Sequence, residues 1–140
     1  MKKDVLISIK DYQISDGAQE NIELTTKGKL SGCPADYKLE FTESFDDENI
    51  CSTTLSVKDR RCVSMLRKGP YSSELIIEQD KRHNCHYVTP YGEFMVGIFA
   101  KSVRSSMDKK GGVLKMNYTV DYYEGYTQEN EMTIEVGTYD

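Results

Sequence analysis

The sequence predicts an all-β protein, an antiparallel meander of about eight to ten strands closed into a barrel. Nine turn signals divide the chain at nearly even intervals, from Asp16-Gly17 to Glu124-Gly125. Between them lie ten short runs in which apolar and polar residues mostly alternate, and this alternation indicates strands with one buried and one solvated face. A meander of this size must protect its sheet edges, and closure into a barrel is the usual solution.

Length and composition fit one domain covering residues 1–140. A chain of this length can bury about two-thirds of its unfolded surface without metal or disulfide support. The hydrophobic fraction of 38%, the ten tyrosines and the absence of tryptophan suit a barrel. Every second residue of such a strand faces water, and tyrosine tolerates a half-buried sheet surface.

The first half of the chain contains six runs with strand character. Asp16-Gly17 joins the first two as a hairpin, because this pair tolerates the positive φ angles of a type I′ turn. The last run contains the continuous apolar segment Leu75-Ile76-Ile77, so a single helical turn is an alternative there. The six runs are residues 4–14, 19–31, 36–44, 50–57, 61–67 and 73–79.

The second half contains the longest run, Tyr91–Val103, and two further alternating runs at 113–122 and 131–136. In each run the apolar residues fall on one face, which we expect to point into the barrel. The residues expected to line the interior, and to contact any ligand bound there, are Phe94, Val96, Ile98, Leu114, Met116, Tyr118 and Val120.

The opposite face of the longest run carries two large apolar side chains. If Val96 and Ile98 point inward, Met95 and Phe99 must point outward. Exposed apolar patches usually mark contact sites, so we expect a homodimer through Met95 and Phe99. In the competing interpretation, a helix or loop formed by Ser102–Lys109 covers both residues within one chain.

Several short motifs occur in a characteristic order along the chain. They are Gln19-Glu20-x-Ile22-Glu23-Leu24, Tyr37-x-Leu39 ending at Glu43, Gly92-Glu93-Phe94, Lys101-Ser102-Val103, Gly112-x-Leu114-x-Met116-x-Tyr118 and Met132-Thr133-Ile134. In order and spacing they resemble the YwiB-like family of small bacterial proteins of uncharacterised function. The resemblance implies a calycin-like, lipocalin-resembling barrel, and it implies no activity and no site residues.

The four cysteines form no Cys-x-x-Cys pair, and the chain begins with no signal-peptide core and contains no membrane-length apolar run. We therefore expect a cytoplasmic protein with free thiols. The segment His83-Asn84-Cys85-His86 is the one cluster with catalytic or metal-binding residue types. His83 and Cys85 share a strand face, but a metal needs three or four ligands and a nucleophile needs a base and an oxyanion donor. A structural role is favoured.

Phosphate-binding, nucleophile-elbow and zincin motifs are missing from the sequence, so we expect no enzyme and no cofactor. The acidic run Asp46-Asp47-Glu48 lacks the spacing of a calcium loop and is interpreted as a solvated turn. Residues 58–83 carry a net charge of +3, but the whole chain carries −5, so nucleic acid is not an expected partner. Tyr122, Tyr123 and Tyr126 flank one turn and could stack on a ligand.

Two functions remain open from the sequence. The first is non-enzymatic binding of a small hydrophobic or amphipathic molecule inside the barrel. The second is an interaction module with a filled barrel, acting on a protein or RNA partner through its outer surface. Interior volume separates them, because a ligand carrier needs a cavity of several hundred Å³.

Overall fold

The computed structural model describes residues 2–15, 17–44, 50–70, 72–89, 92–122 and 126–138. Within these ranges every regular element is a β-strand. The described residues contain no helix long and apolar enough to span a membrane. The strands are β1 (Lys3–Ser15), β2 (Ala18–Gly32), β3 (Tyr37–Ser44), β4 (Ile50–Lys58), β5 (Cys62–Lys68), β6 (Ser73–Glu78), β7 (Arg82–Thr89), β8 (Gly92–Asp108), β9 (Gly111–Asp121) and β10 (Thr127–Thr138).

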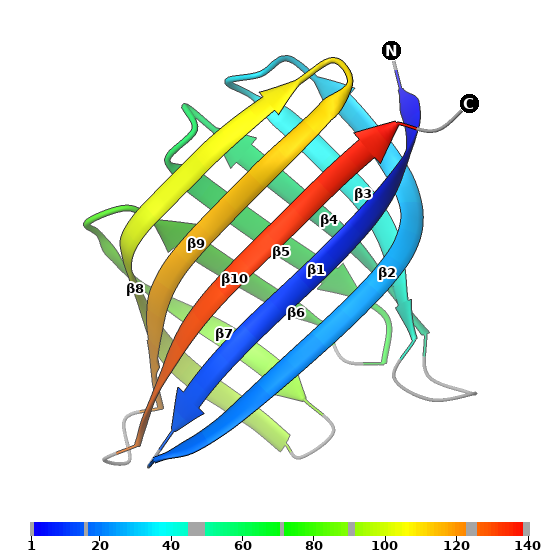
Figure 1. Ribbon diagram of the computed structural model, residues 1–140. Coiled ribbons are helices and arrows are strands. Elements are labelled where there is room, and N and C mark those ends of the chain that lie inside the picture. Colours follow the sequence, from blue (N-terminus) through cyan, green and yellow to red (C-terminus); the bar gives the residue numbers. More distant parts are fainter. Residues whose placement is uncertain are drawn as a thin grey trace.

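The ten strands form one closed antiparallel barrel in which each strand neighbours the next along the chain and β1 closes on β10 (Figure 1). The predicted fold class is thus confirmed. Both termini lie at one end, which we call the terminal end. The other end, which we call the distal end, is where β1, β3, β5, β7 and β9 finish and where β2, β4, β6, β8 and β10 begin.

Alternation along the strands builds the core. Ile7, Leu39, Leu55 and Ile134, from four different strands, are fully buried inside the barrel. The register pairs inward residues with one another, as Ile7 pairs with Val136 across the β1–β10 closure. Neighbouring strands therefore present one continuous apolar inner surface, as the period-two pattern predicts.

The β4–β5 connection shows how a sequence turn signal becomes a hairpin. Asp59 and Arg60 have φ angles of 52° and 58°, and the Arg61 amide donates a hydrogen bond to the Lys58 carbonyl at 3.1 Å. Two successive residues with positive φ define a type I′ turn, whose twist matches that of the flanking strands. The turn predicted at this position is confirmed.

The structure excludes two alternatives that the sequence left open. Ser73–Glu78 is a strand, not a helical turn, because it pairs with β5 through Val63–Ile77 and neighbouring positions. The interpretation of Ser102–Lys109 as a covering helix or loop is wrong, because Ser102–Asp108 continues β8 and pairs with β9. A bulge between Ala100 and Ser102 shifts the register there, so that Val103 takes over the inward position.

The wall between β2 and β3 is paired only near the terminal end. Gly28–Gly32 pairs with Tyr37–Phe41, whereas the earlier part of β2 pairs only with β1 among the described residues. A Cβ atom on Gly28 would collide with the Glu40 carbonyl oxygen and the Ile7 side chain, so glycine permits the close approach where this ladder begins. The distal half of β2 is consequently more exposed than its terminal half.

Candidate functional site

The residues expected to line the interior lie on β8 and β9, and most are buried. The buried ones are Val96, Ile98, Leu114, Met116, Tyr118 and Val120. Phe94 is half-buried at the distal end, where its ring packs edge-on against Tyr122 with a centroid separation of 5.6 Å. The inward face predicted for these strands is confirmed.

A cavity of about 90 Å³ remains inside the barrel at the distal end. Four of the predicted residues line it, namely Val96, Ile98, Tyr118 and Val120, and Leu75 of β6 contributes to another wall. Leu114 and Met116 do not line it. This volume is far below the several hundred Å³ expected of a carrier for a large apolar ligand, so any molecule enclosed there must be small.

Polar side chains form a hydrogen-bonded chain along one wall of this cavity. Gln128 Nε2 donates to Gln13 Oε1 at 3.2 Å, and Gln13 Nε2 donates to Asp11 Oδ2 at 2.8 Å. Asn130 Nδ2 approaches both Asp11 carboxylate oxygens at 3.3 and 3.4 Å. These residues come from β1 and β10, whose register places Gln13 directly opposite Asn130. The Asp11 carboxylate is the acceptor on which two amides converge.

Asp11 and Asn130 are buried without being fully satisfied. Asp11 is 8% exposed, and burial raises the pKa of its carboxyl, an effect that the hydrogen bonds from Gln13 and Asn130 only partly offset. Asn130 is 3% exposed, and its Oδ1 finds no hydrogen-bond donor within the part of the chain that the structure describes. A buried acceptor without a donor costs free energy, so a further hydrogen-bond donor at Asn130 Oδ1 would be stabilising.

Three tyrosines, Tyr87, Tyr118 and Tyr122, contribute rings to the same cavity. Burial is the main cause that raises the pKa of Tyr118 well above its ordinary value and that of Tyr122 to about 12. Both hydroxyls are therefore neutral at physiological pH. The rings offer flat aromatic faces beside the Asp11 carboxylate, whose charge further raises the Tyr118 pKa.

Arg67 on β5 also lines the cavity, and its guanidinium is a positively charged group on the lining. Its guanidinium forms an ion pair with Glu43 of β3, with Nη2 and Oε2 2.8 Å apart and both side chains mostly buried. Because this pair is neutral as a unit, Asp11 supplies the net charge of the cavity wall when it is ionised.

A shallower depression of about 410 Å³ adjoins the cavity at the distal rim and is open to solvent. It shares Gln13 and Gln128 with the cavity, and Glu20 and Tyr126 also line it. Tyr126 packs against Tyr122 with a ring separation of 5.2 Å. The side chains of Gln13 and Gln128 thus border both the cavity and the solvent-exposed depression.

The side chains of the His83–His86 segment contact different partners in the structure. His83 Nε2 lies 2.8 Å from Glu78 Oε1, and the Cys85 thiol accepts a hydrogen bond from the Ile76 amide at 3.3 Å. Burial raises the pKa of Cys85, which disfavours the reactive thiolate. His86 faces outward near Glu93. Among the described residues no group of three His, Cys, Asp or Glu side chains could hold a metal ion.

A second cavity, of about 60 Å³, lies at the terminal end between Leu30, Tyr37 and Met107. The Tyr37 hydroxyl is hydrogen-bonded to Ser105 Oγ at 2.7 Å, and none of the unpartnered buried polar atoms found in the described ranges lies on this lining. The acidic run Asp46-Asp47-Glu48 and Tyr123 lie outside the described residues. The distal cavity is therefore the better candidate site.

Sequence reasoning missed the polar wall, although the pattern contained a signal for it. Asp11 occupies the next inward position after Ile9 on β1, and Asn130 occupies the inward position before Met132 on β10. A polar residue in register with a buried apolar series is a candidate site residue, because the fold must otherwise bear its desolvation cost.

The geometry defines a class of protein: a closed ten-stranded antiparallel barrel with a small, partly polar cavity at one end. The family described as "Domain of unknown function (DUF1934)" matches residues 7–134, and the chain belongs to this family. The crystal structure of the ywiB protein from Bacillus subtilis is similar, with a TM-score of 0.86 over 99% of this chain and 94% of that chain at 22% identity. The expected YwiB-like relationship is confirmed. No curated protein matches the sequence.

Proposed function

We propose that this protein is a non-enzymatic binder of a small amphipathic molecule, held in the distal cavity in a calycin-like manner. The observation that carries the proposal is the buried pair Asp11 and Asn130, which faces a cavity beside aromatic rings while the Asn130 Oδ1 acceptor has no donor. A protein that needed only a filled core would gain stability from apolar residues at these positions. The presence of polar residues beside a cavity therefore supports ligand binding.

The size of the cavity limits the enclosed part of the ligand. An apolar cavity of about 150 Å³ admits benzene, so about 90 Å³ corresponds to roughly four non-hydrogen atoms. Larger ligands must extend past Gln13 and Gln128 into the rim depression. The ligand we propose is thus smaller and more polar than the long apolar molecules that open barrels carry.

Catalysis is not part of this proposal. The Cys85 thiol is buried with a raised pKa, and His83 is engaged by Glu78, so the two side chains with nucleophilic potential support a structural role. We further propose a cytoplasmic location, which the four unpaired cysteines support.

Native mass spectrometry with a pair of matched variants tests the proposed binding. Leu75→Trp places a large side chain at the cavity, whereas Leu66→Trp makes the same change at an exposed position of β5. We expect a small molecule to co-purify with the wild type and with Leu66→Trp, but not with Leu75→Trp. If neither co-purification nor a fragment screen by NMR detects binding that Leu75→Trp abolishes, the proposal is wrong.

A second candidate function is association through the outer surface of β8. Met95 and Phe99 are 57% and 36% exposed, which supports the expected dimer contact. The register sets Met95 beside His86 and Phe99 beside Arg82, so the apolar area is narrow and bordered by polar groups. A typical interface needs about 800 Å² per partner, so this patch alone supplies only part of one.

A further inference from the structure

We propose that the ligand is a small organic cation, a primary ammonium on a short apolar chain, bound by Asp11 and Asn130. This inference rests on the proposed function and adds the chemical class of the ligand. It follows from the hydrogen-bonding groups of the wall, from the charge balance of the interior, and from the charge of the whole distal end.

Two acceptors on the wall, the Asp11 carboxylate and Asn130 Oδ1, have unused capacity for hydrogen bonds. The Asp11 carboxylate can accept more hydrogen bonds than the two amides supply, and Asn130 Oδ1 accepts none from the described residues. An ammonium group carries three donors and no acceptor, so it satisfies both groups at once. A neutral alcohol offers a single donor, and a carboxylate offers none.

The charge balance of the interior also favours a cation. Asp11 is buried beside the neutral tyrosines, whereas the Arg67 charge is compensated by Glu43 at 2.8 Å. The cationic side chain on the cavity lining is thus paired with Glu43 and not with Asp11, and an ammonium would give an ionised Asp11 an opposite charge of its own through a charge-assisted hydrogen bond. Tyr118 and Tyr122 add aromatic faces that attract cations within about 6 Å of the ring centre.

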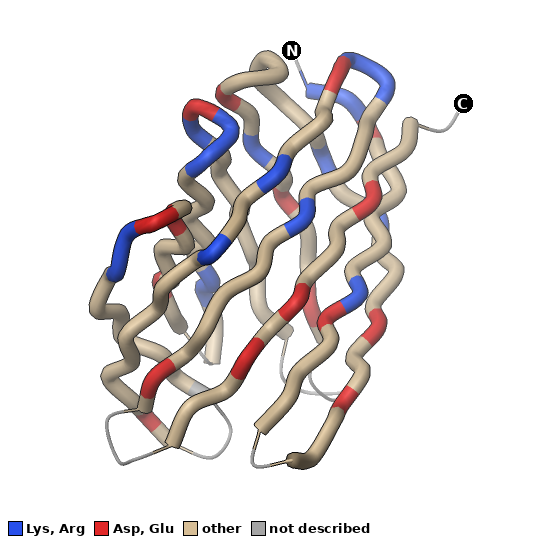
Figure 2. The backbone as a smooth tube through the Cα atoms, turned by 60° about the vertical axis from the view of Figure 1, so that its left-hand side comes forward, with Lys and Arg blue, Asp and Glu red and all other residues tan. Residues whose placement is uncertain are grey.

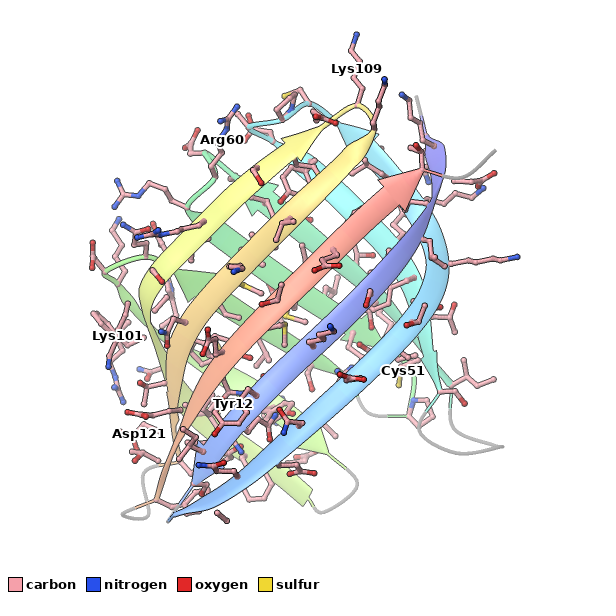
Figure 3. All side chains as sticks on the ribbon, in the orientation of Figure 1. Tyr12, Cys51, Arg60, Lys101, Lys109 and Asp121 are labelled. Atoms are coloured by element: carbon pink, nitrogen blue, oxygen red, sulfur yellow. The ribbon has the colours of Figure 1, made fainter. Side chains whose placement is uncertain are left out.

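The charge of the distal end would draw cations toward this cavity. Within five residues of that end, the ten strands carry nine Asp or Glu residues and two Lys or Arg residues. The turns at the terminal end carry both signs with basic residues in the majority, including Arg60 and Lys109, which project from that end in Figure 3. Figure 2 shows acidic positions on the distal parts of β9 and β10, and positions of both signs in the turns at the terminal end. Such a field raises the local concentration of cations.

Three probes of one shape test the inference by NMR titration of the isotope-labelled full-length protein. The probes are n-propylammonium and n-propanol, with four non-hydrogen atoms each, and propanoate, with five, close to the roughly four that the cavity encloses. We expect n-propylammonium to bind about 10–100-fold more tightly than n-propanol, the gain expected of a charge-assisted hydrogen bond, and propanoate not to bind. The shifts should centre on the side-chain amides of Gln13 and Asn130.

Asp11→Asn should reduce the affinity for n-propylammonium to that for n-propanol. Glu135→Gln removes one charge from the outward face of β10 outside the distal end and should leave the affinity unchanged within about twofold, since exposed charges are screened. Retained spectral dispersion shows that each variant is folded. Equal binding of the cation and the alcohol, or an unchanged affinity in Asp11→Asn, would overturn the inference while leaving the binding function intact. Loss of binding for every probe, together with no co-purifying ligand, would instead remove the proposed function itself.

Discussion

Replacing Tyr118 by aspartate tests the inner face of β9 most severely. Tyr118 is 5% exposed and lies near Asp11 and Asn130, so the change removes a buried aromatic ring and places a second carboxylate beside the first. Loss of a buried aromatic side chain costs about 3–5 kcal/mol, and an unpaired buried carboxylate adds several more. The total exceeds about 5 kcal/mol, a large share of the roughly 5–15 kcal/mol that stabilises a typical domain.

Urea denaturation and thermal melting give the assay. At about 4 °C per kcal/mol for a chain of this size, Tyr118→Asp should lower Tm by about 20 °C or prevent folding. Tyr118→Phe keeps the ring and should cost only about 1 kcal/mol. Asn117→Asp, one residue away but exposed, should stay within about 0.5 kcal/mol, even with Glu131 opposite it in the register. Equal losses in Tyr118→Asp and Asn117→Asp would refute the assigned face.

Three further predictions concern pH, thiols and assembly. Burial raises the pKa of the Asp11 carboxyl in the folded protein above its ordinary 3.8. The protonated carboxyl therefore adds to the free energy of unfolding below pH 3.8, and this contribution is lost as pH rises through the folded-state pKa. Asp11→Asn should therefore gain urea resistance over the wild type between pH 4 and 7, and a constant difference would contradict this. A thiol reagent without reductant should label exposed Cys33 first and buried Cys85 only on unfolding, and should count four thiols in total; a lower count means a disulfide. Sedimentation should show a dimer that the double variant Met95→Lys/Phe99→Lys dissociates, and a monomeric wild type removes the patch from the account.

The fold was predictable because local signals carry most of it. Turn residues such as Asp59-Arg60 set the hairpins, and alternation along β9 and β10 set the buried face. The bulge near Lys101 was not predictable, because it depends on how the long strand β8 curves between β7 and β9. Closure of β1 on β10 was inferred from the need to protect edges, but its register depends on packing across the whole barrel.

The candidate site was predictable only in part. Val96, Ile98, Tyr118 and Val120 were expected inside and line the cavity. The position and volume of the cavity along the barrel could not be predicted, because both depend on how side chains from distant strands fill the same space. Asp11 could have been found by following the inward series of β1 to its end.

A crystal structure of the protein grown with n-propylammonium tests the central claim most directly, namely that the distal cavity is a binding site built around Asp11. The account predicts an ordered ligand in the cavity, with its nitrogen within about 3.2 Å of an Asp11 carboxylate oxygen and of Asn130 Oδ1, and with its carbon chain against the tyrosine rings. A cavity filled by rearranged protein side chains, or a ligand bound only elsewhere on the surface, would contradict it.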